Sequence, residues 1–97
     1  MDIQKLSVII PVYNEERTLT QILDRVRETE LIHGIEKELI IVNDCSTDKS
    51  EDIILAYQKE HPELTIEYLA HEKNQGKGAA LHNGIKKASG EYLIIQD

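Results

Sequence analysis

The 97-residue chain fits one small domain or part of a larger one, since typical domains have roughly 100–150 residues. Its composition, 40% hydrophobic and 30% charged with five glycines and two prolines, is typical of a soluble globular protein and excludes a disordered or fibrous chain. Eleven basic side chains against eighteen acidic ones leave a net charge of −7. Because an acidic chain without a basic stripe is repelled by phosphate backbones and anionic lipids, nucleic acid and anionic membranes are unsuitable partners.

The cysteine count and the apolar stretches bear on where the protein acts. The single cysteine, Cys45, cannot form an internal disulfide, so the sequence predicts a cytoplasmic protein. The longest apolar stretch, residues 8–13, is far below the roughly 20 residues that span a bilayer, so no membrane span is expected in this chain. Residues 91–97 predict an apolar strand with no turn after it. We therefore expect a chain cut in mid-domain, with bare apolar surface that favours self-association.

Strand patterns alternate with helix patterns along the chain. Residues 6–12 form a β-branched apolar run, typical of a strand that is buried on both faces. The period changes from Glu15, where the sequence predicts a helix with Asn14 as its N-cap. The pattern recurs with a strand at 39–42 and a helix after Thr47, in which Asp48 and Glu51 are spaced as a capping pair.

The second half of the chain continues this alternation. Residues 64–70 alternate in polarity and predict a strand near a sheet edge. A third helix is expected to bury Leu81, Gly84, Ile85 and Ala88 and to end at a C′ glycine, Gly90. Residues 92–95 predict a fourth strand. The order βαβαβαβ predicts an α/β fold, a Rossmann-like doubly wound and mostly parallel sheet with helices on both faces. The loops that begin at Tyr13, Asn43 and Gln96 should then meet at one ligand site.

The loops at these strand ends carry candidate binding residues. Tyr13 could stack on a planar base, and the alternative is that it only packs while Asn14 caps the helix. The carboxylate of Asp44 could accept a base N–H, and the alternative is that it faces the dipole of the second helix. Asp97 closes an apolar strand, where a carboxylate can hold a divalent metal.

The loop from Asn74 to Gly78 has two glycines around Lys77, in the manner of a phosphate cradle. It fits neither a dinucleotide fingerprint, which needs a glycine where Leu81 stands, nor a P-loop, which needs Ser or Thr where Gly78 stands. The alternative is that both glycines only form turns. The remaining candidate ligands lack a metal-ligand spacing, so we interpret them as structural or solvent-facing: His33, His61, His71, His82 and Cys45.

Four blocks in order, at residues 8–15, 41–48, 74–84 and 90–97, resemble the N-terminal part of inverting family 2 glycosyltransferases, which have the GT-A nucleotide-diphospho-sugar transferase fold. The Gly-Lys-Gly-Ala-Ala and Gln-Asp segments look most like the dolichol-phosphate (polyprenyl-phosphate) mannosyltransferases and glucosyltransferases. The resemblance implies transfer of a sugar, with inversion at the anomeric carbon, from a GDP- or UDP-linked donor to an acceptor such as a polyprenyl phosphate. It also implies a parent protein at the cytoplasmic face of the membrane.

The resemblance assigns roles to six residues. The nucleoside pocket would be lined by Pro11, Tyr13 and Glu15, while Val42 would pack on the base and Asp44 would bond its polar edge. Asp97 would be the first aspartate of the Asp-x-Asp motif, which holds Mg²⁺ or Mn²⁺ on the diphosphate. Two positions depart from the family pattern, with Asn43 where Asp is frequent and Cys45 where Gly is common.

The resemblance also sets the extent of the chain. The second motif aspartate, the acceptor site and any catalytic base would follow residue 97, so residues 1–97 would form the donor-binding half, which alone is expected to be inactive. Two alternatives remain. One is a nucleotide-binding or receiver-like signalling module, which lacks its expected aspartate after the strand at 64–70. The other is a sugar-phosphate nucleotidyltransferase, which lacks its Gly- and Arg-rich loop after the first strand.

Overall fold

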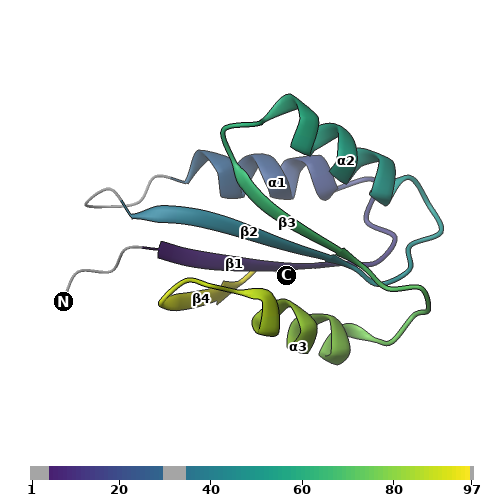
Figure 1. Cartoon of the computed structure of the whole chain (residues 1–97). Coiled ribbons are helices and arrows are strands. Elements are labelled where there is room, and N and C mark those ends of the chain that lie inside the picture. Colours follow the sequence, from purple (N-terminus) through teal and green to yellow (C-terminus); the bar gives the residue numbers. More distant parts are fainter. Residues whose placement is uncertain (1–4, 30–34, 97) are drawn as a thin grey trace.

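The computed structural model describes residues 5–29 and 35–96 and contains the predicted βαβαβαβ order (Figure 1). The strands and helices in chain order are β1 (Lys5–Val12), α1 (Leu19–Glu28), β2 (Glu36–Asn43), α2 (Ser50–Glu60), β3 (Thr65–Ala70), α3 (Lys77–Lys87) and β4 (Tyr92–Ile95). Each predicted strand and helix is therefore present, with shifts of a few residues at the ends.

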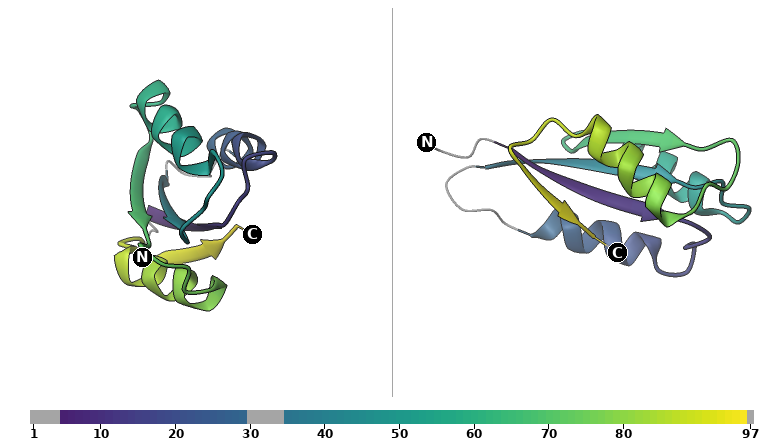
Figure 2. Two further views of the ribbon diagram at one scale, coloured as in Figure 1. Left: turned by 90° about the vertical axis from the view of Figure 1, so that its right-hand side faces the viewer. Right: turned by 90° about the horizontal axis from the view of Figure 1, so that it is seen from below.

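All four strands are parallel, in the order β3-β2-β1-β4. Helices α1 and α2 cover one face of the sheet and α3 covers the other, as Figure 2 shows. This strand order is that of the Rossmann fold, whereas receiver domains have the order 2-1-3-4-5. The topology confirms the doubly wound parallel sheet and rules out the receiver-like alternative.

The apolar strand residues alternate between two cores. On the α1 and α2 side, Val8 and Ile10 of β1 pack with Leu39 and Ile41 of β2. On the α3 side, the fully buried Ile9 packs with a smaller cluster formed by Ile40, Val42 and Ala80. Burial on both faces explains why β1 and β2 are continuous apolar runs, while β3 at the edge has only half-buried and exposed residues.

Helix α3 packs closely on the sheet through a glycine. A Cβ on Gly84 would lie 2.7 Å from Cγ2 of Ile9 and 3.2 Å from Cγ2 of Val42. Ala80, one turn earlier, is also buried, but Ile85 is 44% exposed. The prediction that Ile85 faces inward is wrong, because it lies about 100° around the helix from Gly84.

Two predicted helix ends are also wrong. Asn14 is not an N-cap, since α1 begins only at Leu19 and Asn14 adopts a left-handed conformation with φ 51°. Gly90 is not a left-handed C′ residue, because α3 ends with the extended Ala88. A Cβ on Gly90 would instead lie 2.7 Å from the Ser7 hydroxyl and 2.9 Å from backbone atoms of β1. Close approach to the strand therefore explains this glycine.

The predicted capping pair of α2 is half formed. Asp48 Oδ1 accepts a hydrogen bond of 2.9 Å from the Ser50 amide at the start of the helix. Glu51 does not reach back, because its carboxylate accepts a 2.7 Å hydrogen bond from the Tyr68 hydroxyl of β3. The second half of the pair thus joins α2 to the sheet edge.

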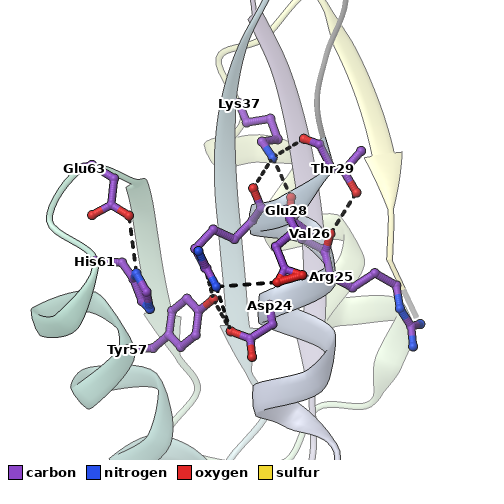
Figure 3. Close-up of polar contacts among 10 residues, drawn as sticks. Asp24, Arg25, Val26, Glu28, Thr29, Lys37, Tyr57, His61 and Glu63 are labelled. Carbon is purple, nitrogen blue, oxygen red and sulfur yellow. Dashed lines mark hydrogen bonds and ion pairs between the residues drawn. The ribbon is translucent and has the colours of Figure 1, made fainter.

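Polar contacts close the end of α1 (Figure 3). The Lys37 ammonium donates to the carbonyls of Val26, Arg27 and Thr29, at 2.6, 2.9 and 2.6 Å. Burial lowers the pKa of this lysine, with a smaller effect from the nearby Arg27 charge. The carbonyls that no helical amide can reach are therefore paired by a cation, which also suits the helix dipole.

A buried glutamate fixes the connection between α3 and β4. The Glu38 carboxylate accepts hydrogen bonds from the Ser7 hydroxyl at 2.7 Å and the Ser89 amide at 2.9 Å, and it lies 3.4 Å from Lys5 Nζ. Burial by itself would raise the pKa of Glu38, but these bonds outweigh it and lower the pKa to about 2. The carboxylate is therefore ionised and stabilises the fold at neutral pH.

Candidate functional site: a cleft at the carboxyl ends of the strands

A cleft of about 270 Å³ lies beyond the carboxyl ends of β1 and β2, beside the start of α3. This edge is the right-hand side of Figure 1 and faces the viewer in the left panel of Figure 2. The lining residues come from the end of β1, from the loops after β1, β2 and β3, and from the first turns of α3: Pro11, Val12, Tyr13, Glu15, Asp44, Asn74, Gly76, Lys77 and Ala80. The edge is the one at which a doubly wound sheet binds its ligand.

The cleft brings together four of the six predicted site residues, namely Pro11, Tyr13, Glu15 and Asp44. Val42 does not line it, because its side chain is fully buried beneath α3. The contact of Val42 with a base stays a prediction, and in this structure the residue packs against Ala80 and Gly84 of α3. Asp97 lies outside the described residues.

The Tyr13 ring is the exposed aromatic surface of the cleft. Its side chain is 49% exposed although it directly follows a buried strand. The next residue, Asn14, is in the left-handed region, so the chain turns sharply after Tyr13. Asn tolerates this conformation better than most residues. An exposed aromatic ring at the wall of a cleft can stack on a planar ligand.

Hydrogen bonds join the loop after β1 to the loop after β2. The Asn14 amide donates to the Ser46 hydroxyl at 2.9 Å, and Asn14 Oδ1 accepts from the Thr47 amide at 2.8 Å. The Glu15 amide donates to the buried Ser50 hydroxyl, also at 2.9 Å. These contacts pair the Asn14 and Glu15 amides, which have no helical partner because α1 begins only at Leu19. They fix Tyr13 and Glu15 relative to Asp44.

Asp44 is the centre of the polar network. It is 3% exposed; Oδ1 accepts hydrogen bonds of 2.8 Å from the Gln75 amide and from His71 Nδ1, and Oδ2 accepts one of 2.8 Å from the Gly76 amide. Burial alone would raise the pKa of Asp44, but these bonds together lower it. Asp44 therefore holds the start of α3, and the alternative that it serves the second helix is wrong. A carboxylate has about four acceptor positions, so one remains on Oδ2 for a ligand.

The same contacts explain one of the two glycines around Lys77. Gly76 has φ 92°, a conformation that only glycine adopts without strain, whereas a Cβ on Gly78 would meet open space. The amides of Gln75 and Gly76 point to Asp44 and are not available to a phosphate. Two amides of the loop are thus occupied, and a phosphate cradle built from the rest of the loop stays a prediction. Gly76 is a turn former that carries α3 to Asp44.

The structure also shows why Asn43 and Cys45 stand beside Asp44. Asn43 Oδ1 accepts from the Ser46 amide at 3.0 Å and its Nδ2 donates to the Tyr68 hydroxyl at 3.0 Å, so it orders the loop from within. Burial and the Glu51 contact raise the pKa of Tyr68 to about 12, against the Asn43 bond. Cys45 has φ 62°. Glycine adopts this left-handed backbone without strain. This explains why glycine is common at position 45 in the family that the sequence resembles.

Sequence reasoning missed the histidine of this site. His71 was predicted to be structural or solvent-facing. It is not solvent-facing, since its side chain is only 8% exposed, and it lies between Asp44 and Asn83 Nδ2, at 2.8 and 2.9 Å. Its partners lie 27 and 12 residues away in the chain. The signal available in the sequence was the place of His71 directly after β3, at the ligand edge of the sheet.

Two further expectations concern metal and membrane. Within residues 5–29 and 35–96, no group of three or more His, Cys, Asp or Glu side chains is placed to hold a metal ion. The expected metal ligand Asp97 lies outside these residues. The helices described here are also too short and too polar to cross a bilayer.

Comparison with known proteins decides the family. The profile of Glycosyl transferase family 2 matches residues 7–97, nearly the whole chain. The chain belongs to glycosyl transferase family 2. The family therefore agrees with the resemblance carried by the four sequence blocks, and neither the receiver-like nor the nucleotidyltransferase alternative is supported.

Curated relatives in this glycosyltransferase family cover almost all of the chain. A dolichyl-phosphate beta-glucosyltransferase of Trichomonas vaginalis is 36% identical over 95% of the chain and 29% of its own length. A poly-beta-1,6-N-acetyl-D-glucosamine synthase of Staphylococcus epidermidis is 37% identical over 98% and 22%. An undecaprenyl-phosphate 4-deoxy-4-formamido-L-arabinose transferase of Photorhabdus laumondii is 37% identical over 98% and 29%. The chain thus spans less than a third of the length of these relatives.

Solved structures confirm the GT-A fold of this family member. A mannosyltransferase from Pyrobaculum calidifontis, in complex with GDP-Man and Mn²⁺, has a TM-score of 0.86 and 26% identity over 96% of the chain and 26% of its own. Residues 1–349 of TarS from Staphylococcus aureus, in complex with UDP-GlcNAc, have a TM-score of 0.84 and 32% identity over 97% and 26%. The similarity extends over the entire sheet and its helices.

Proposed function

We propose that the cleft binds the nucleoside diphosphate of a nucleotide-activated sugar, so that this chain is the donor-binding half of a glycosyltransferase. The observation that carries the proposal is the meeting of the exposed Tyr13 ring and the partly satisfied Asp44 carboxylate in one cleft. The ring offers a stacking surface for a base, and Oδ2 of Asp44 offers an acceptor for a base N–H. The structural neighbours bound to GDP-Man and UDP-GlcNAc support this class of ligand.

We also propose that a divalent cation, Mg²⁺ or Mn²⁺, accompanies the donor, with Asp97 as a ligand. The charge of the cleft supports a cation, because Glu15 and Asp44 are its acidic lining residues and Lys77 is its basic one. A diphosphate brought to this acidic wall needs added positive charge. When bound, the metal would neutralise the charge of the departing nucleoside diphosphate. The Mn²⁺ of the mannosyltransferase neighbour is consistent with this proposal.

For the acceptor we propose a polyprenyl phosphate. The support is that two of the relatives named above are a dolichyl-phosphate and an undecaprenyl-phosphate transferase. The transfer we propose forms a bond from an acceptor oxygen to the anomeric carbon and releases the nucleoside diphosphate, with inversion. A cytoplasmic location, supported by the single cysteine, would suit such an enzyme.

A nucleotide titration of the ¹⁵N-labelled chain tests the proposed ligand. GDP or UDP at millimolar concentration should shift the amide resonances of Tyr13, Asp44 and Gly76. Tyr13→Ala should weaken binding at least about fivefold, since stacking on a base contributes roughly 1–3 kcal/mol. Tyr92→Ala is the matched control. Tyr92 is also exposed, at 58%, but it pairs with Leu6 at the amino ends of the strands, away from the cleft. Shifts from neither nucleotide, or equal losses in both variants, would refute the assignment.

A further inference from the structure

A partly buried hydrogen-bonded chain runs from the cleft to helix α3. It consists of Asp44 at the end of β2, His71 after β3, and Asn83 on α3. The side chains of Asp44 and His71 are 5% and 8% exposed. The His71 backbone is held as well, because its amide donates to the Asn43 carbonyl at 2.9 Å. The imidazole therefore has a single place and two defined partners.

The partners determine where the His71 proton lies. The Asn83 amide nitrogen can only donate, so Nε2 of His71 must accept across their 2.9 Å contact. The ring proton is then on Nδ1, from which it is donated to Asp44 Oδ1 at 2.8 Å. A neutral imidazole with its proton on Nδ1 satisfies both contacts. Asn83 in this way sets the tautomer that Asp44 requires.

We propose that His71 is a positioning residue of the nucleotide cleft, which orients the Asp44 carboxylate so that Oδ2 is the acceptor presented to a ligand. Oδ1 already accepts from the Gln75 amide and from His71, whereas Oδ2 accepts only from the Gly76 amide. Without the His71 bond, Oδ1 would regain an acceptor position and the carboxylate could rotate. This inference rests on the proposed function of the cleft.

The free acceptor position on Asp44 Oδ2 selects a class of base. A carboxylate oxygen accepts a ring N–H, and uracil and guanine carry such a group on their base-pairing edge. Cytosine and adenine carry an acceptor nitrogen at the same place, which Oδ2 would repel. The cleft should accordingly prefer UDP or GDP to CDP or ADP.

Two substitutions at one position separate the roles of the two ring nitrogens. In His71→Asn the side-chain amide nitrogen takes the place of Nδ1 and can still donate to Asp44, while the contact with Asn83 is lost. In His71→Gln the amide group takes the place of Nε2, so Asn83 keeps a partner and Asp44 loses one. We expect similar melting temperatures for the two variants. The dissociation constant of the preferred nucleotide should rise about tenfold in His71→Gln and stay within about threefold of wild type in His71→Asn.

A spectroscopic measurement on the unliganded chain tests the tautomer independently of binding. The ¹⁵N resonances of the His71 ring at neutral pH should show a protonated Nδ1 and an unprotonated Nε2. A proton on Nε2 alone, or on both nitrogens, would overturn the proposal, and so would equal nucleotide losses in the Asn and Gln variants. If wild type binds none of the four nucleoside diphosphates, the proposed function fails together with the base preference. The ring resonances then still decide whether His71 orients Asp44.

Discussion

The close contact of α3 with the sheet makes a quantitative prediction about Gly84. In Gly84→Ala the new methyl group would lie 2.7 Å from Cγ2 of Ile9, a fully buried β-branched side chain that has no flexible end to move away. Overpacking of this kind costs about 1–3 kcal/mol, while replacing a helical glycine by alanine returns about 1 kcal/mol. We therefore expect Gly84→Ala to lower the free energy of unfolding by up to about 2 kcal/mol.

Gly78 provides the matched control on the same helix. A Cβ at Gly78 meets no atom within 4 Å, so Gly78→Ala should raise the free energy of unfolding by about 0.5 kcal/mol through helix propensity alone. Urea denaturation of both variants measures the difference, with the slope of the transition checked for constancy. If Gly84→Ala is as stable as Gly78→Ala, then α3 does not pack on Ile9 at the distance given above, and the close packing that holds α3 on the sheet is refuted.

Three further predictions concern stability and assembly. The pKa of Glu38 is lowered to about 2 in the folded chain, so its ionised carboxylate stabilises the fold fully above the unfolded pKa, and this stability is lost as the pH falls toward 2. Between pH 5 and 2 the free energy of unfolding of wild type should fall by about 3 kcal/mol more than that of Glu38→Gln. Urea melts at a series of pH values measure this difference, and parallel curves for the two proteins would contradict it. Cys45→Gly should raise the melting temperature and Cys45→Val should lower it, because φ is 62° and left-handed strain of about 1–2 kcal/mol exceeds the entropy cost of glycine; the opposite order would exclude strain at this position. Strand β4 exposes four apolar side chains beside an unpaired edge, so the chain should form dimers or larger species by light scattering that Ile94→Lys reduces; a monodisperse monomer at high concentration would rule this out.

Much of the fold could be predicted from local patterns. The apolar runs at residues 8–12 and 39–42 indicate strands buried on both faces, and the structure buries them between α1 and α2 on one side and α3 on the other. The chain order of these segments then limits the topology, because parallel strands joined by helices pack in few ways. For the same reason the loops after β1 and β2 could be placed at one edge, and Pro11, Tyr13, Glu15 and Asp44 do line one cleft.

Contacts between distant residues could not be predicted in this way. Asn14 has the side chain of a helix cap, but the structure turns it to the Ser46 and Thr47 loop, 32 and 33 residues away. Asp44 was placed correctly at the sheet edge, yet its partners in the Gln75 and Gly76 amides lie 31 and 32 residues on. The sequence by itself determined the strands, the helices and the edge where the loops meet, since these depend on the period and order of apolar residues. Only the tertiary structure decided which polar groups pair at that edge, because a buried donor or acceptor takes whichever partner packing brings within reach.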